Sequence, residues 1–153
     1  MKIRTDFVTN SSSSSFVVID AKKGYDELSC DYNSLFVGRK GETEFGWGPA
    51  TVGYDIYTRI NFAYLQTLYA GKDEWLEMLE KVIKKNSNIS IIDYKLSNDY
   101  SCEKKCSDVV WGYIDHQSNA GEGCNTEMFD SEQSLKDFIF GKGSRIVLDN
   151  DNH

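Results

Sequence analysis

The chain has 153 residues, of which 40% are hydrophobic and 13% aromatic, a composition that suits one domain with a real core. Its formal net charge of −7 repels phosphate groups and therefore disfavours direct binding of nucleic acid. No apolar run reaches the roughly 18 residues of a membrane span, so no membrane insertion is expected. Such an acidic surface either attracts a basic partner protein or simply keeps the protein soluble.

A run of five serines stands near the start of the chain, between two apolar stretches: Ser11, Ser12, Ser13, Ser14 and Ser15. Phe7 and Val8 precede the run, and the wholly apolar stretch 16–19 follows it and predicts a buried strand. Because both flanks must leave water, we expect the serines to be ordered and to lead directly into that strand. Their hydroxyls can also bind an anion or accept a phosphate, which makes them candidate binding residues.

The stretch from residue 21 to residue 49 contains turn signals and one further strand. Residues 21–31 are mixed and charged and predict a loop, whereas 35–37, ended by Gly38, predicts a short strand. Residues 42–49 contain two glycines and the only proline, which indicates an irregular loop. Phe45 and Trp47 in this loop either anchor it in the core or, if exposed, form a binding site.

Residues 54–85 show the clearest helical pattern. From Ile56 to Leu68 apolar residues recur every three or four positions, which predicts a helix that starts near residue 54 and ends at Gly71. A second helix is predicted to begin at Asp73, with one apolar face formed by Trp75, Leu76, Leu79, Val82 and Ile83. The short connection at 70–72 predicts a helical hairpin.

The last third of the chain predicts three strands and one helix. Strands are expected at 89–94 and 109–114, paired antiparallel through the polar connection 95–108. Residues 117–126 contain two glycines and predict a mobile loop. Ser131 is placed to cap a final helix that ends at Gly141, and a short strand at 145–148 follows.

The predicted order is β-β-αα-β-β-α-β, in which strands and helices do not strictly alternate. This order predicts a single α+β domain over residues 1–148, followed by a polar tail at 149–153. The domain is expected to have a mixed or antiparallel sheet, with the helical hairpin and the C-terminal helix packed on it.

Asp115 and His116 follow a predicted strand, a position from which a histidine can act as general acid or base. With a serine or cysteine nucleophile, His116 would make the protein a small enzyme. Adjacent strand residues point to opposite faces, so Asp115 is poorly placed to orient His116. The alternative interpretation is a strand-end histidine that is bonded to the backbone.

Four cysteines occur: Cys30, Cys102, Cys106 and Cys124. Because no apolar export segment follows Lys2 and Arg4, we expect a cytoplasmic protein with reduced thiols. Zinc takes four ligands of the kind that Cys102, Cys106, His116 and Cys124 offer, but their spacing matches no familiar zinc pattern. We therefore predict no cofactor, and zinc binding, a regulatory disulfide between Cys102 and Cys106, and unrelated thiols are the alternatives for these residues.

The opening sequence MKIRTDFVTNSSSSSF, residues 1–16, resembles the start of an uncharacterised family of short proteins from Firmicutes and their mobile elements. A weaker similarity lies in GYIDHQS at 112–118 and in SLKDFIFG at 134–141. The resemblance implies a Firmicute or phage source and supplies no catalytic residue.

The chain shows no coherent catalytic set, and it is small and acidic. These features predict a non-enzymatic, cytoplasmic protein that binds another protein, and an inhibitor of a host defence nuclease is one concrete version. A small enzyme that uses His116 and a zinc-binding protein are the two alternatives.

Overall fold

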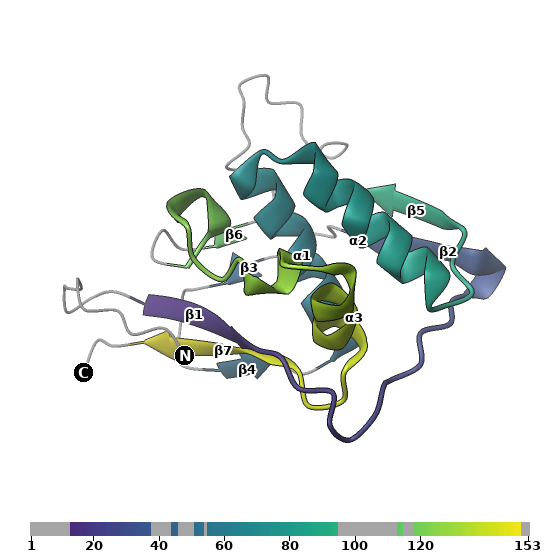
Figure 1. Cartoon of the computed structure of the whole chain (residues 1–153), viewed down its shortest axis with the longest axis horizontal. Coiled ribbons are helices and arrows are strands. Elements are labelled where there is room, and N and C mark those ends of the chain that lie inside the picture. The colour runs from purple at the N-terminus through teal and green to yellow at the C-terminus, as the bar shows by residue number, and fades with distance from the viewer. Residues whose placement is uncertain are drawn as a thin grey trace.

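The computed structural model describes residues 13–37, 44–45, 51–53, 55–94, 113–114 and 118–150 (Figure 1). The fold is α+β, as predicted, with three helices: α1 (Ile56–Ala70), α2 (Asp73–Lys85) and α3 (Glu132–Phe140). The strands are β1 (Ser13–Val18), β2 (Ser34–Val37), β3 (Glu44–Phe45), β4 (Thr51–Gly53), β5 (Ile91–Tyr94), β6 (Tyr113–Ile114) and β7 (Arg145–Asn150). Short 3₁₀ turns lie at Asp31–Asn33, Ala120–Glu122 and Glu127–Phe129. None of the described helices is both long and apolar enough to cross a membrane.

The described strands form three small sheets rather than one. Strand β7 lies between β1 and β4 in an antiparallel sheet, while β2 pairs with β5 and β3 pairs with β6, both in parallel. The predicted antiparallel pairing of 89–94 with 109–114 is not present between β5 and β6, the described strands of these two segments, and residues 95–112 lie outside the described part. Parallel strands need a crossover connection, and the hairpin of α1 and α2 supplies one between β2 and β5.

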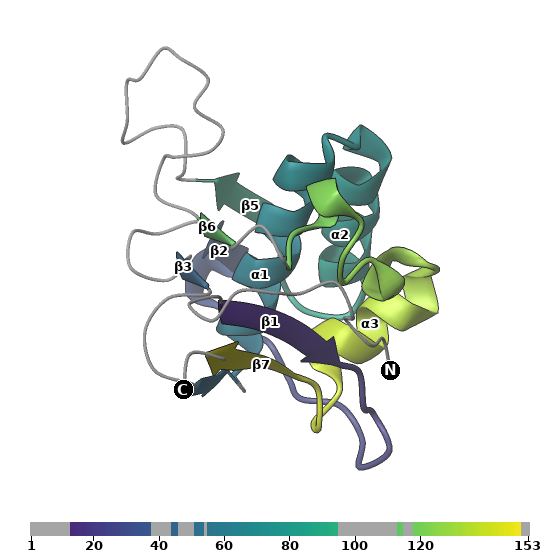
Figure 2. The same cartoon turned by 90° about the vertical axis from the view of Figure 1, so that its left-hand side faces the viewer.

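The antiparallel sheet contains Ser13, Ser14 and Ser15 of the serine run. Two of its strands, β1 and β7, have boundaries that differ from the predicted ones. Strand β1 begins at Ser13, and only alternate residues turn inward, so Val17 is buried while Phe16 is 41% exposed. The prediction of a strand wholly buried from 16 to 19 is wrong, because the helices cover one face of this sheet (Figure 2). Strand β7 continues past residue 148 to Asn150, which pairs with Ser13.

The helix boundaries follow the local signals in the sequence. Asp55 caps α1 by accepting from the backbone N–H groups of Tyr57 and Thr58, and Gly71 ends it in the left-handed conformation at φ 65°. Helix α2 begins at Asp73 as predicted. Ser131 caps α3 by accepting from the Ser134 N–H at 3.0 Å, which confirms the predicted cap.

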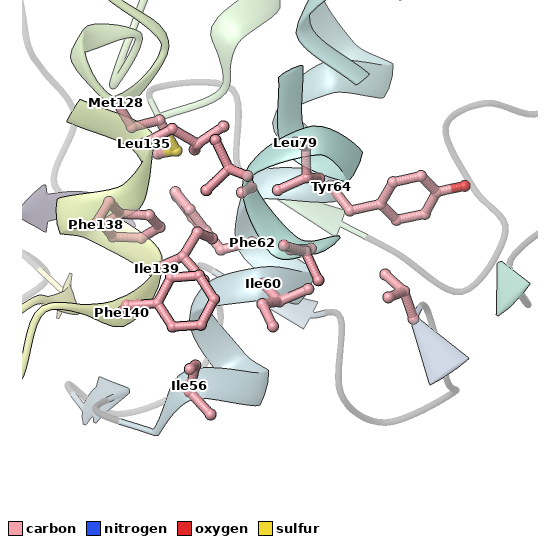
Figure 3. Packing of buried hydrophobic residues seen from close by; sticks show 14 of the residues in the cluster. Ile56, Ile60, Phe62, Tyr64, Leu79, Met128, Leu135, Phe138, Ile139 and Phe140 are labelled. Atoms are coloured by element: carbon pink, nitrogen blue, oxygen red, sulfur yellow. The ribbon is translucent and has the colours of Figure 1, made fainter. Parts of the chain in front are cut away.

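The core lies between the three helices and the antiparallel sheet (Figure 3). Phe62 of α1 faces Phe138 of α3 with ring centroids 6.5 Å apart, and Leu79 of α2 joins them. Met128, from the segment before α3, closes the cluster and is fully buried. Burial of this kind is worth about 25 cal/mol for each Å² of apolar surface removed from water.

A buried arginine ties the end of α3 to the loop after β1. Arg59 is 0% exposed, and its Nη1 donates to the carbonyl oxygens of Phe138 and Gly141. Its Nη2 donates to Asp26 Oδ2 at 2.8 Å. Burial alone would raise the pKa of Asp26, but the charges and hydrogen bonds of Arg59 and Lys142 outweigh it and lower that pKa. We call Arg59, its partners Phe138, Gly141 and Asp26, and Lys142, which pairs with Asp26, the Arg59 cluster.

The segment 118–126 belongs to the predicted mobile loop 117–126, but hydrogen bonds from a side chain of α1 hold it in place. Gln66 is fully buried, and its Oε1 accepts from the Ala120 N–H at 2.6 Å while its Nε2 donates to the Ser118 carbonyl at 3.1 Å. Asn125, which is buried with φ 55°, donates to the same Ser118 carbonyl at 2.9 Å. The prediction fails here because a side chain from a distant helix supplies the hydrogen-bond partners that the loop lacks locally.

Candidate functional site

Some of the predicted binding residues of the serine run and of the predicted loop 42–49 lie inside the described part of the chain. Ser13, Ser14 and Ser15 belong to β1, where they pair with residues 148–150 of β7, while Ser11 and Ser12 lie outside the described residues. Phe45 lies in β3, opposite Ile114 of β6, and Trp47 is outside the described residues.

The predicted catalytic and zinc-binding residues are mostly outside the described part. Asp115, His116, Cys102 and Cys106 all lie there. Cys124 is described, half-buried, and its thiol donates to the Glu122 carbonyl at 3.9 Å. Among the described residues no group of three or more His, Cys, Asp or Glu side chains is arranged to hold a metal ion.

Exposed apolar residues lie on the outward side of the β2–β5 pair and in the turn that precedes β2. Tyr32 is 93% exposed, Ile91 56% and Phe36 40%, and we call these three residues the Tyr32 face. The pair lies beside the helical hairpin at one end of the molecule, apart from the antiparallel sheet (Figures 1 and 2). Large apolar side chains gathered on one surface mark interaction sites more often than scattered ones do.

The alternation of the two strands explains why Phe36 and Ile91 face outward. Leu35 and Val37 of β2 are buried, so Ser34 and Phe36 point to the other side. In the parallel register Ile91 lies opposite Ser34 and Asp93 opposite Phe36. The outward side of the pair is therefore a mixture of aromatic, aliphatic and acidic groups.

The inward side of the pair is fastened to the helices. The ring of Tyr94 stacks on Tyr64 of α1 with centroids 4.6 Å apart, and its hydroxyl donates to Glu80 of α2. Burial and the neighbouring Glu80 carboxylate raise the pKa of Tyr94, so its hydroxyl stays protonated and remains a donor. This attachment gives the Tyr32 face a rigid base.

Tyr32 itself is held in an unfavourable backbone conformation. Its φ and ψ are 58° and 18°, and Asn33 follows with φ 55°, so two consecutive non-glycine residues are left-handed. For a residue with a Cβ this conformation costs about 1–2 kcal/mol. Tyr32 buries almost none of its side chain in return. Backbone strain that local packing does not offset is characteristic of functional positions.

Asn88 clamps the turn that presents Tyr32. Its Oδ1 accepts from the Cys30 N–H at 3.1 Å, and its Nδ2 donates to the Cys30 carbonyl at 3.1 Å and to Asn33 Oδ1 at 2.8 Å. The Ser90 N–H donates to the Asn33 carbonyl at 2.9 Å. The residues on both sides of Tyr32 are thereby tied to the segment that leads into β5.

The electrostatic surroundings of the Tyr32 face are acidic. Segments 27–37 and 86–94 contain Glu27, Asp31 and Asp93 but no lysine or arginine. Asp31 is exposed directly beside Tyr32. A binding partner would therefore meet an apolar centre within a negatively charged surround.

Sequence-based prediction missed Tyr32, although one signal was present. Tyr32 stands between Asp31, Asn33 and Ser34, which favour turns, so an aromatic residue in that position had no strand or helix face to bury it. Comparison with known proteins finds no matching family model, no similar curated protein and no similar solved structure.

Proposed function

We propose that the protein is a non-enzymatic, cytoplasmic interaction protein that binds a partner protein through the Tyr32 face. The observation that carries the proposal is the almost complete exposure of Tyr32 in a strained, clamped turn. Tyrosine is enriched among the residues that dominate binding energies, because it offers a large rigid surface and a polar tip. A backbone turn that is held in place beforehand loses little conformational entropy on binding.

The partner that fits this surface has an apolar pocket for Tyr32 with basic residues around it. Asp31 and Asp93 lie beside the apolar groups, and the whole chain has a net charge of −7. Complementary charges would accelerate the encounter and orient the partner, while the aromatic contact would supply most of the affinity. The same charge argues against nucleic acid as the partner. An inhibitor of a host defence protein is one role consistent with this chemistry.

The proposal is tested by placing a photoreactive amino acid at position 32 of the full chain and irradiating it in a Firmicute extract. The source follows from the resemblance of residues 1–16. A protein crosslinked from position 32 is then purified and its affinity for the unmodified chain and for Tyr32→Gly is measured. We expect Tyr32→Gly to weaken binding at least tenfold, which corresponds to about 1.4 kcal/mol.

Phe16→Ser is the matched control, because Phe16 is a similarly large exposed aromatic residue on a different sheet. It should leave the affinity within about twofold. A partner that binds Tyr32→Gly as tightly as the unmodified chain would overturn the proposal, and so would the absence of any crosslink from position 32.

A further inference from the structure

The loop after β1 and the turn before β7 lie side by side and are joined by hydrogen bonds (Figure 1). The Lys142 N–H donates to the Gly24 carbonyl at 2.9 Å, and the Gly143 N–H donates to the Asp20 carbonyl at 2.9 Å. The Asp20 N–H donates in turn to Ser144 Oγ at 2.9 Å, across 124 residues of the chain. These bonds fix the two segments to each other, so the side chains that they carry form one surface.

Four lysines gather where these two segments meet. Lys22 and Lys23 are exposed and belong to the loop after β1. Lys142 is also exposed, and its backbone is bonded to that loop. Lys136 of α3 places its Nζ 4.5 Å from the centroid of the Tyr25 ring, which is itself 41% exposed. We call these four lysines the lysine surface.

The carboxylates beside the lysine surface are few, and each already accepts a hydrogen bond. Segments 20–26 and 136–145 contain five basic and three acidic residues, whereas the whole chain contains 17 basic and 24 acidic ones. The three carboxylates accept as follows: Asp20 from the Lys22 N–H, Asp26 from Arg59, and Asp137 from Tyr25 and Gln133. Within the described part of the chain, no carboxylate forms an ion pair with Lys22, Lys23 or Lys136. The lysine surface is therefore a positively charged area on an acidic protein.

The glycine-rich turn beside these lysines is not a phosphate cradle. Residues 141–144 read GKGS, and backbone N–H groups of such a run can surround an anion. Here all four N–H groups donate inside the protein: Gly141 to Asp137, Lys142 to Gly24, Gly143 to Asp20 and Ser144 to Gly141. The surface therefore offers separate ammonium groups, each a point charge on a flexible stem, rather than a compact site for one phosphate.

We infer that the lysine surface binds an extended acidic segment of a partner protein. Carboxylates spaced along such a segment can meet the separate ammonium groups one after another, and the complementary charges would orient the segment. Tyr25 helps to position Lys136, because its hydroxyl donates to Asp137 at 2.7 Å and holds the ring beside the ammonium group. A long polyanion such as nucleic acid would instead be repelled by the net charge of −7. The lysine surface shares no residue with the Tyr32 face, so a partner can use either one alone.

A synthetic peptide of alternating glutamate and serine tests the inference with the full chain. We expect it to bind about tenfold more tightly than the same peptide with glutamine in place of glutamate, and to lose affinity as salt is added. Bound peptide should shift the NMR amide signals of Gly24 and Lys142 but not that of Ile91 in the Tyr32 face. Equal affinity for the two peptides would overturn the inference. Tighter binding of polyuridylate RNA of the same charge would also overturn it and would assign the surface to nucleic acid.

Lys22→Gln combined with Lys23→Gln removes two of the four ammonium groups. Lys84→Gln combined with Lys85→Gln is the matched control, because it also removes two adjacent exposed lysines but at the end of α2. Both double variants change the net charge equally. We expect the first to weaken binding of the glutamate peptide about tenfold and the second to leave it within about twofold. Equal losses in the two variants would show that only the total charge matters and would overturn the inference, whereas Tyr32→Gly should leave peptide binding unchanged.

Discussion

The Arg59 cluster and the Tyr32 turn are both held by side-chain hydrogen bonds to the backbone of distant segments, yet they lie at opposite extremes of exposure. Arg59 is completely buried, and the groups it holds are the end of α3 and the loop after β1. Tyr32 is 93% exposed, and the clamp formed by Asn88 holds the turn around it rather than the side chain.

Hydrogen bonds of the same kind have different consequences in these two regions. In the Arg59 cluster the bonds pair the buried guanidinium with the Phe138 and Gly141 carbonyls and with the Asp26 carboxylate, so they support the fold. Around Tyr32 the bonds maintain a conformation that the backbone alone would avoid. Substitutions in the two regions should therefore change the stability in opposite directions.

The largest expected effect is that of Arg59→Met, which removes the guanidinium donor from the Phe138 carbonyl, one of the two donors from the Gly141 carbonyl, and the ion pair with Asp26. We expect the free energy of unfolding to fall by about 3–5 kcal/mol, as measured by chemical denaturation. Arg145→Met is the matched control, because Arg145 is half-buried and its side chain donates locally to the Gly143 carbonyl at 2.8 Å. A loss below about 1 kcal/mol for Arg59→Met would show that the cluster contributes little.

Gln66→Ala should have the second largest effect. It removes the partner of the Ala120 N–H and one of the two donors to the Ser118 carbonyl, so we expect a loss of about 2 kcal/mol and faster hydrogen exchange in 118–126. Gln133→Ala, on the exposed side of α3, should change the stability by less than about 0.5 kcal/mol. Equal effects of the two substitutions would contradict the role given to Gln66.

Tyr32→Gly should act in the opposite direction and raise the free energy of unfolding by about 0.5–1 kcal/mol. Glycine adopts the left-handed conformation without strain, which outweighs its larger entropy in the unfolded chain. Tyr25→Gly is the matched control and should lower the stability, because the Tyr25 hydroxyl donates to Asp137 at 2.7 Å. A lower thermal midpoint for Tyr32→Gly would show that the turn is not strained.

The smallest effect concerns pH and the Asp26 carboxylate of the Arg59 cluster. Because the folded state lowers its pKa, the ionised carboxylate stabilises the protein above the ordinary value of 3.8. That stabilisation is lost as the pH falls through the folded-state pKa. Asp26→Asn should therefore flatten the dependence of unfolding free energy on pH below about pH 5. An unchanged pH dependence would contradict the pairing of Asp26 with Arg59.

The helices could be predicted from the sequence because their signals are local. The apolar spacing of α2, the serine cap of α3 and the glycine after α1 all act within a few residues. The α+β class also followed from the order of these segments. The strand at the serine run was predicted in part, since Ser13–Ser15 do lead into the apolar residues but as members of the same strand.

The strand pairing and the Tyr32 face were decided by the tertiary structure. Strand β5 pairs with β2, which is more than fifty residues earlier in the chain, and the segment before β5 supplies Asn88 to the turn at Tyr32. Gln66 similarly determines the conformation of a segment about fifty residues later. Apolar periodicity and helix caps depend only on residues that are close to one another in the sequence. Which distant segments meet depends on how the helices pack over the core, and only that packing brings the hydrogen-bond partners of these residues together.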